Sequence, residues 1–274
     1  MRVDIENLGF SYSPKAKVLH DINLTLSEPG LVCILGPNGV GKSTLVKCID
    51  KLHLATEGSI TINESDVSKM SYRELSKIIG FVPAGSSDGF SMSVVDTVLM
   101  GRAPHKHLGS EAEDLRIVYR VLKELKLTHL ALRNYNELSA GQHQKVSIAR
   151  GLAQEPDLLI LDEPTANLDI RHQVMVLDLL KRISREKGII VLMISHDLNI
   201  TAKYADSVIV MSTPGVIYSI GTPKEVINEE MIRYVYGMNS TIIEKDGVPF
   251  IMLGAALSDE EMLEMHRDEN DYDS

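Results

Sequence analysis

The chain has 274 residues, of which 44% are hydrophobic and 24% charged, and its formal net charge is −10. This length can bury a sizeable core, and the composition is typical of a soluble globular protein with one large domain or one domain carrying an inserted lobe. The acidic balance argues against non-specific nucleic-acid binding, which depends on a basic face. We therefore expect no nucleic-acid partner.

Two further features bear on the compartment. The only cysteines, Cys33 and Cys48, lie in an apolar and an amphipathic segment, so we expect two buried thiols and no disulfide framework. The first residues contain no apolar core of signal-peptide length. Apolar stretches such as Gly188–Ile194 are far shorter than the ~20 residues that cross a bilayer. Any membrane role is expected to come through a partner.

Strand patterns come first along the chain. Val3–Phe10 and Ile22–Leu26 alternate between apolar and polar residues, which is typical of antiparallel strands. Nearly continuous apolar runs predict parallel strands that are covered on both faces. These runs are Leu31–Leu35, Leu158–Leu161, Ile189–Ile194 and Val208–Met211, and further strand candidates are Ile60–Asn63 and Ile78–Val82. The pattern predicts an α/β fold.

The strand signal disappears between about residues 85 and 153. Ser110 and Glu113 form a capping-box pattern that predicts a helix start. Apolar residues then follow at helical spacing: Leu115, Val118, Leu122 and Leu125. We expect residues 85–153 to form a helical lobe inserted into an α/β core made of residues 1–84 and 154–238.

The C-terminal part combines a helix, a hairpin and a tail. A helix is predicted over Glu229–Tyr236, and the strands Thr241–Glu244 and Val248–Leu253 follow it. The Asp-Gly pair between these strands is a hairpin turn signal. Ser258–Ser274 is rich in Asp and Glu, which predicts a disordered acidic tail. Hairpin and tail occupy residues 239–274.

A glycine-rich loop directly follows the strand Leu31–Leu35 and leads into a helical pattern. The loop consists of Gly36, Pro37, Asn38, Gly39, Val40, Gly41, Lys42, Ser43 and Thr44. This is the P-loop pattern between a strand and a helix, the context that validates it. Its backbone N–H groups and the helix N-terminus bind phosphate. We expect Lys42 to reach the β- and γ-phosphates and Ser43 to offer its hydroxyl to Mg²⁺.

Two adjacent carboxylates end the buried strand Leu158–Leu161. Such groups are costly in an apolar setting unless they have partners or a function. Asp162, at the strand end, suits the Mg²⁺ shell. Glu163 points elsewhere and suits a general base that orients water for attack on the γ-phosphate.

A second helix start decides which P-loop protein this is. Ser139 and Gln142 form a capping-box pattern before a helix predicted over Gln142–Ala153. The segment reads Leu138, Ser139, Ala140, Gly141 and Gln142. It resembles the LSGGQ signature of the ABC ATPases, with alanine in place of one glycine. The resemblance spans nearly the whole chain and implies a RecA-like P-loop NTPase core with an antiparallel β subdomain and an inserted ABC helical subdomain.

The resemblance assigns roles to further residues. Tyr12 matches the aromatic residue that stacks on adenine, and His196 matches the switch histidine that contacts the γ-phosphate. Asp169 lies in the loop that communicates across the dimer. In this family the signature of one subunit closes over the ATP held by the other, which implies a dimer with two composite ATP sites. The residues expected to act in trans are Ser139, Ala140, Gly141, Gln142 and Asp169.

One position departs from the family pattern. After the strand Ile78–Val82 the family carries a glutamine that contacts Mg²⁺ and the attacking water, but this chain carries Ala84. Alanine can make neither contact, so we expect slowed or poorly coupled hydrolysis with ATP binding largely intact. Ser86 and Ser87 are candidates for a partial substitute through a water.

Finer resemblances suggest a type of transporter. The segments around Gly101-Arg102 and Tyr236-Gly237 look like the motors of importers for iron–siderophore complexes, haem and vitamin B12. The implied partners are many-helix permease subunits and, indirectly, an extracytoplasmic substrate-binding protein, with this chain peripheral on the cytoplasmic face of the membrane. His105 and His107 are interpreted as a solvated loop because two ligands rarely hold Zn²⁺. A zinc or manganese importer motor and a soluble ABC ATPase of the iron–sulfur assembly type remain alternatives.

Overall fold

The computed structural model describes residues 1–85, 91–105, 110–258 and 260–262. The expectations for Ser86, Ser87, His107 and most of the acidic tail lie outside these residues. Two cores run through the described part of the chain, one on each face of a central sheet. Cys33 and Cys48 are free and buried, as predicted.

The central sheet has six strands in the order β10-β9-β3-β8-β7-β6. Their bounds are β3 Gly30–Leu35, β6 Ile79–Val82, β7 Leu158–Leu161, β8 Ile190–Ile194, β9 Ser207–Ser212 and β10 Val216–Gly221. All neighbours pair in parallel except β10, which is antiparallel to β9. The α/β prediction is therefore confirmed. The edge strand β10 was not predicted, because its side chains are only partly buried and lack the continuous apolar run.

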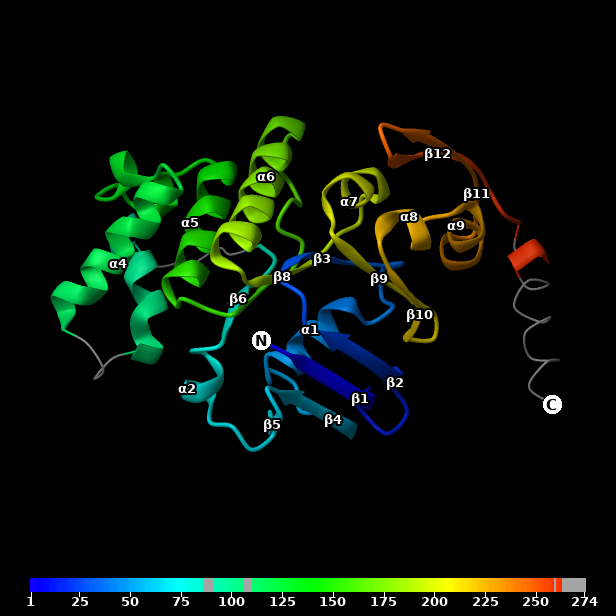
Figure 1. Ribbon diagram of the computed structural model, residues 1–274, viewed down its shortest axis with the longest axis horizontal. Helices are drawn as coiled ribbons and strands as arrows, with labels where there is room; N and C mark the ends of the chain where they lie inside the picture. The colour runs from blue at the N-terminus through cyan, green and yellow to red at the C-terminus, as the bar shows by residue number, and fades with distance from the viewer. Residues whose placement is uncertain (86–90, 106–109, 259, 263–274) are drawn as a thin grey trace.

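A second, antiparallel sheet has the order β2-β1-β4-β5. It contains β1 Val3–Ser11, β2 Lys17–Leu26, β4 Glu57–Ile62 and β5 Ser65–Asp66. Helix α1, Lys42–Ile49, packs between the two sheets, as Figure 1 shows. Leu52 lies beyond the end of α1 and is exposed.

The parallel strands bury both faces by simple alternation. In β3, Val32 and Ile34 pack in the core that contains α1, while Leu31, Cys33 and Leu35 pack in the opposite core. This two-sided burial explains why β3 appears in the sequence as an unbroken apolar run. The strand ends at Leu35, and the glycine-rich loop begins there.

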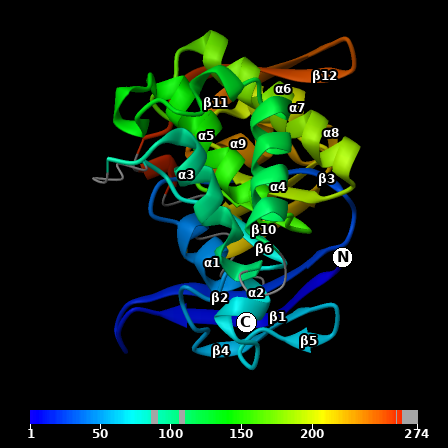
Figure 2. The same cartoon turned by 90° about the vertical axis from the view of Figure 1, so that its left-hand side faces the viewer.

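Residues 91–105 and 110–153 are helical and contain no named strand. The elements are α3 Val94–Leu99, η1 Met100–His105, α4 Glu111–Glu124, η2 Thr128–Leu130, η3 Tyr135–Glu137 and α5 Ala140–Ala153, and the short α2 Tyr72–Leu75 precedes them. Figure 2 shows α3, α4 and α5 gathered on one side of the molecule, above the antiparallel sheet. Ser110 caps α4 by accepting a hydrogen bond from the N–H of Glu113, as predicted.

The buried face of α4 differs from the predicted stripe. Leu115 is 44% exposed, whereas Ile117 and Val121 are buried together with Val118 and Leu122. The buried residues follow the contacts that α4 makes with α3 and α5. Val118, Leu122 and Leu125 are therefore buried as predicted. The prediction was wrong for Leu115, because the packing neighbours decide how far the covered face extends.

The rest of the chain returns to the central sheet and ends in a hairpin. It comprises α6 Ile170–Lys187, α7 Leu198–Tyr204, α8 Pro223–Val226, α9 Glu229–Tyr236, β11 Met238–Lys245 and β12 Val248–Ala256. Asp246 and Gly247 both have positive φ at the turn, as the Asp-Gly signal predicts. In Figure 1 the hairpin lies beyond α7 and α9, far from α4. Across the described residues, every helix is too short or too polar to span a membrane.

Candidate nucleotide site

The loop between β3 and α1 has the conformation that a phosphate cradle requires. Gly36 has φ 147°, and an added Cβ would lie 2.5 Å from the carbonyl oxygen of Met211. Gly41, the N-cap of α1, has φ 107° and makes no side-chain cap bond. The first N–H groups of α1 are therefore left for a ligand, next to the positive end of the helix dipole.

Lys42 is only 5% exposed, although it carries a charge. Its Nζ donates to the carbonyl oxygens of Gly36 at 2.7 Å and Pro37 at 2.8 Å. Burial lowers the pKa of Lys42, and the charges of Glu163 and Asp162 oppose this effect. The loop thus holds the ammonium group against its own backbone, close to where an anion would sit.

Ser43 and Asp162 form the second polar pair. The Ser43 hydroxyl donates to Oδ1 of Asp162 at 3.1 Å. Asp162 follows β7, and its N–H donates to the carbonyl of Val82 at 2.9 Å, so neighbouring strands fix its backbone. Desolvation raises the pKa of Asp162, while the bond from Ser43 acts in the opposite direction. The structure therefore brings together the two residues that were separately predicted to contact Mg²⁺.

Glu163 and His196 come from the ends of β7 and β8. Nε2 of His196 lies 2.6 Å from Oε1 of Glu163. A carboxylate only accepts hydrogen bonds, so Nε2 carries the proton in this pair. Glu163 has φ 51°, an uncommon conformation for a residue with a side chain, and such backbone strain is found frequently at functional sites. No sequence spacing indicated this direct contact.

Tyr12 borders the loop from the antiparallel sheet and is 58% exposed. Its hydroxyl lies 3.2 Å from Oγ1 of Thr44 and 3.3 Å from Nε2 of His53. The rings of Phe10 and His53 are stacked 5.0 Å apart, and both meet Tyr12 edge-on. Sequence analysis missed His53, because only the fold brings it beside Tyr12.

These groups surround one cavity of about 300 Å³. Its lining includes Tyr12, Lys42, Ser43, Thr44, Glu163 and His196. Asp162 lies behind it through Ser43. Ser139, Ala140, Gly141, Gln142 and Asp169, all of which the structure describes, do not line this cavity. The cavity therefore gathers most of the residues expected to act in cis, although Gly36, Pro37 and Val40 do not line it, and lacks those expected to act in trans.

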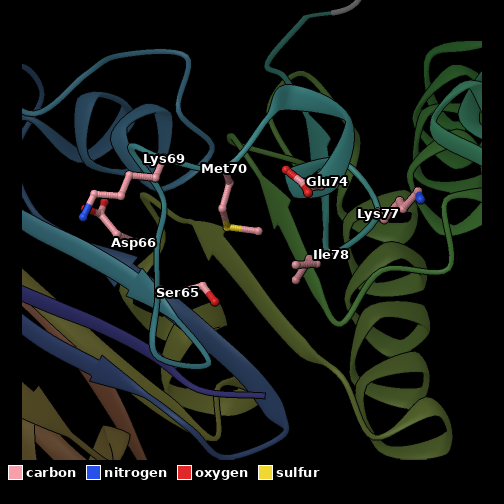
Figure 3. Close-up of a pocket in the computed structure, with 7 residues that line it drawn as sticks. All are labelled: Ser65, Asp66, Lys69, Met70, Glu74, Lys77 and Ile78. Atoms are coloured by element: carbon pink, nitrogen blue, oxygen red, sulfur yellow. The ribbon is translucent and has the colours of Figure 1, made fainter.

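A larger cavity of about 640 Å³ lies elsewhere, between the β5 region and α2 (Figure 3). Three of its charged side chains already have local partners: Lys69 lies 3.4 Å from Asp66, and Glu74 accepts the N–H and hydroxyl of Ser71. Figure 3 shows the thioether of Met70 between these groups. We do not assign this cavity to the nucleotide, because it presents no cluster of free donors.

The signature segment starts a helix with a capping box. Ser139 accepts from the N–H of Gln142, and the Gln142 side chain accepts from the N–H of Ser139. The capping box is therefore confirmed, and α5 begins at Ala140, slightly earlier than predicted. Ser139 and Ala140 are exposed, whereas Gly141 is buried.

Ala84 and the Gly101-Arg102 motif have distinct surroundings. Ala84 is exposed just after β6 and offers no polar side chain. Arg102 is 6% exposed and binds Asp114 at 2.8 Å, the carbonyl of Ala153 at 2.7 Å and Glu155 at 3.1 Å. The Gly101-Arg102 motif thus joins η1, α4 and α5 rather than contacting the cavity. No group of three or more metal-ligating side chains occurs in the described part of the chain.

The ABC transporter family model matches residues 19–166, which is more than half of the chain. The chain belongs to the ABC transporter family. This ABC protein is 41% identical to an uncharacterized ABC transporter ATP-binding protein of Methanocaldococcus jannaschii, over 92% of this chain and 98% of that one. It is 33% identical to an iron(3+)-hydroxamate import ATP-binding protein of Bacillus subtilis (87% and 88%) and 34% identical to a hemin import ATP-binding protein of Myxococcus xanthus (86% and 90%).

Solved structures agree with this membership. One chain of a metal-chelate type ABC transporter in an inward-facing conformation superposes with a TM-score of 0.78 and 29% identity, covering 94% of this chain and 98% of that chain. An ATP-binding cassette whose dimer was solved in a post-hydrolysis state with ADP and Pi superposes with a TM-score of 0.68 and 29% identity, covering 81% and 98%. The ABC protein described here is accordingly an ABC-type ATPase with a P-loop NTPase fold.

Proposed function

We propose that this ATPase powers a membrane importer, with iron–siderophore complexes, haem or cobalamin as its class of cargo. The observation that carries the ATPase site is the convergence of Lys42, Ser43, Glu163 and His196 on one cavity. The names of the relatives support the importer role and this class of cargo. In our proposal this chain does not bind the cargo, so the lining of the nucleotide cavity gives no information about the cargo.

In the proposed mechanism, the P-loop backbone and α1 bind the phosphates of ATP, and Tyr12 stacks on adenine. Lys42 exchanges its two carbonyl partners for β- and γ-phosphate oxygens, a short movement because Nζ already lies within the loop. Glu163 orients and deprotonates the attacking water. His196 leaves Oε1 of Glu163 to contact the γ-phosphate, which frees the carboxylate to act as a base.

The donor set fits Mg²⁺. Ser43 and Asp162 place a hydroxyl and a carboxylate oxygen 3.1 Å apart, and oxygen ligands of this kind are those that Mg²⁺ prefers, together with substrate phosphates. Bound there, the ion would neutralise charge on the phosphates. The residues themselves hold the site in shape: Asp162 through the Val82 carbonyl and Ser43 as the second residue of α1.

We propose that the second half of each ATP site comes from another copy of the chain. Ser139, Ala140, Gly141, Gln142 and Asp169 lie outside the cavity of their own protomer. The dimeric cassette among the structural neighbours supports this arrangement. In this proposal residues 85–153 form the signature-bearing subdomain, and residues 1–84 with 154–238 form the ATP-binding core.

The membrane partners are also part of the proposal. We place the chain on the cytoplasmic face of the cell membrane through many-helix permease subunits, which receive cargo from a substrate-binding protein. The relatives with printed import functions support this placement. Co-purification of the chain with a permease tests it, and exclusive co-purification with soluble scaffold proteins contradicts it.

The central test is Glu163→Gln. This change keeps the size of the side chain and one acceptor oxygen but removes the base, so turnover is expected to fall by about 10²–10⁴-fold. ATP binding is retained, and an ATP-trapped dimer accumulates that size-exclusion chromatography detects. Glu137→Gln, an exposed substitution on η3, is the control and keeps normal turnover. Normal turnover in Glu163→Gln contradicts the role assigned to Glu163.

A further inference from the structure

His172 lies against the signature segment of its own protomer. It belongs to the first turn of α6, and a Cβ added to Gly141 would lie 2.6 Å from its Cδ2 and 3.0 Å from its Cγ. Gly141 is an ordinary helical residue of α5 without positive φ. The backbone at this position accepts any L-residue, so the imidazole ring is what requires a glycine here.

The imidazole ring is fixed by Asp169. Nδ1 of His172 lies 2.8 Å from Oδ2 of Asp169, and the backbone N–H of His172 donates to Oδ1 at 2.9 Å. These bonds from the backbone and then the ring lower the pKa of Asp169, which favours its ionised, accepting form. Nδ1 therefore carries the proton. A ring held in this way cannot swing aside freely, as the end of a flexible side chain would.

The same turn of α6 holds the segment that leads back to Glu163. Asp169 is the N-cap of α6, and Nε2 of Gln173 donates to the carbonyl of Thr165 at 3.3 Å. The chain from Glu163 to Asp169 is thus attached to α6, and α6 is attached to α5 through His172 and Gly141. The signature turn and the Asp169 loop, which are distant in sequence, are thus joined through the contact between His172 and Gly141.

We propose that His172 is a positioning residue that holds the signature turn and the Asp169 loop as one preformed surface for a second copy of the chain. The inference rests on the proposed function, in which both segments close over the ATP of the other protomer. Separately mobile segments would each lose conformational entropy on closure, whereas a preformed surface avoids that cost. His172 acts through Gly141 and Asp169, without contacting nucleotide in its own protomer.

The alternative is that His172 and Asp169 only cap α6. Both side chains are substantially exposed, 40% and 66%, and exposed pairs contribute little to stability. A capping role predicts a small loss of thermal stability and no effect on dimerisation. The two roles therefore separate in a dimerisation assay.

The first experiment uses the Glu163→Gln background and measures the ATP-dependent monomer–dimer equilibrium by analytical ultracentrifugation. His172→Ala is expected to weaken the dimer about tenfold, the size expected for coupled neighbours. Binding of a fluorescent ATP analogue to the monomer stays unchanged, because His172 does not line the cavity. His129→Ala, an exposed histidine on η2, is the matched control and changes neither quantity.

The second experiment is a double-mutant cycle with Gly141→Ala. Alone, this substitution places a methyl group against the ring and is expected to weaken the dimer more than about tenfold. With His172→Ala already present, the added cost of Gly141→Ala falls to less than about threefold. Equal costs in both backgrounds overturn the inference. So does an unchanged dimer in His172→Ala.

The outcomes also separate the inference from the function on which it rests. If Glu163→Gln forms no dimer with ATP, the proposed composite site is wrong. If it forms the dimer and the cycle shows no coupling, only the positioning role of His172 is wrong. A coupled cycle with normal monomer binding supports both.

Discussion

The starts of α1 and α5 are the two helix N-termini that we propose to contact phosphate, yet they are built differently. At α1, Gly41 provides no side-chain cap, so the first N–H groups remain available. At α5, Ser139 and Gln142 satisfy each other in a complete capping box. The first start has no side-chain cap, whereas in the second the capping box satisfies the N–H groups of Ser139 and Gln142.

The two starts also differ in charge. Lys42 is buried within the α1 loop and bound only to backbone carbonyls. The first turn of α5 contains no cation, and its exposed members are Ser139 and Ala140. The difference fits our proposal that one protomer binds ATP on its own and that the α5 surface of a second copy completes the site.

Lys42→Ala removes the positive charge at the start of α1. It carries the largest expected effect, which is on ATP affinity. Charge-assisted hydrogen bonds contribute about 1.5–3 kcal/mol each, so two of them lost predict a fall in ATP affinity of at least about 100-fold. Titration calorimetry with the isolated chain measures this. Lys47→Ala, further along α1, is the control and changes affinity less than about threefold. Similar losses in both variants contradict the assignment.

Ser139→Ala tests the start of α5, which has no lysine. ATP binding to the monomer is expected to stay unchanged, because Ser139 lies outside the cavity. Turnover and ATP-dependent dimerisation are expected to fall about tenfold, the size of one hydrogen bond made only on closure. Loss of the cap also costs about 1 kcal/mol of stability, so thermal unfolding is followed in parallel. Ser139→Thr keeps the oxygen and restores activity. Reduced ATP binding to the monomer contradicts the proposal that Ser139 acts only on the ATP of a second copy.

Ala84→Gln introduces a polar side chain after β6, between the core and the helical segment. Turnover is expected to rise about three- to tenfold if the added amide contacts the attacking water, since one polar contact accounts for such a change. Steady-state phosphate release measures it. Ala84→Leu adds bulk without polarity and is expected to leave turnover low. An unchanged rate in Ala84→Gln removes the basis for regarding Ala84 as a functional departure.

Asp50→Asn tests the opposite end of α1 and carries the smallest effect. Burial raises the pKa of Asp50 to about 7, and a carboxylate at a helix C-terminus also opposes the helix dipole. The folded state therefore binds more protons than the unfolded state between about pH 4 and pH 7, so ionisation destabilises the fold as pH rises through this window.

Removal of this charge is expected to raise the melting temperature by about 3 °C at pH 8 and by nothing measurable at pH 4. Differential scanning calorimetry across this range measures the difference. Glu28→Gln, at an exposed position, is expected to give a pH-independent offset. A constant offset for Asp50→Asn contradicts the burial of its charge.

Most of the central fold could be predicted because its signals are local or periodic. The runs that became β3, β7 and β8 are buried on both faces, and such burial requires continuous apolar sequence. The capping pattern at Ser139 and the Asp-Gly turn after β11 involve only neighbouring residues. For α4 the periodicity predicted the helix and most of its buried stripe but not the exposure of Leu115, because its neighbours α3 and α5 decide how far the buried face extends.

The sequence by itself determined the ABC family, the P-loop, the strand-end carboxylates and the signature helix, since each depends on residue types at short spacing. Only the tertiary structure decided which side chains meet. Examples are His196 with Glu163, Tyr12 with Thr44, and His172 with Gly141. Each of these contacts joins segments from different elements, and their distance depends on how sheets and helices pack. No local pattern of residues encodes that distance.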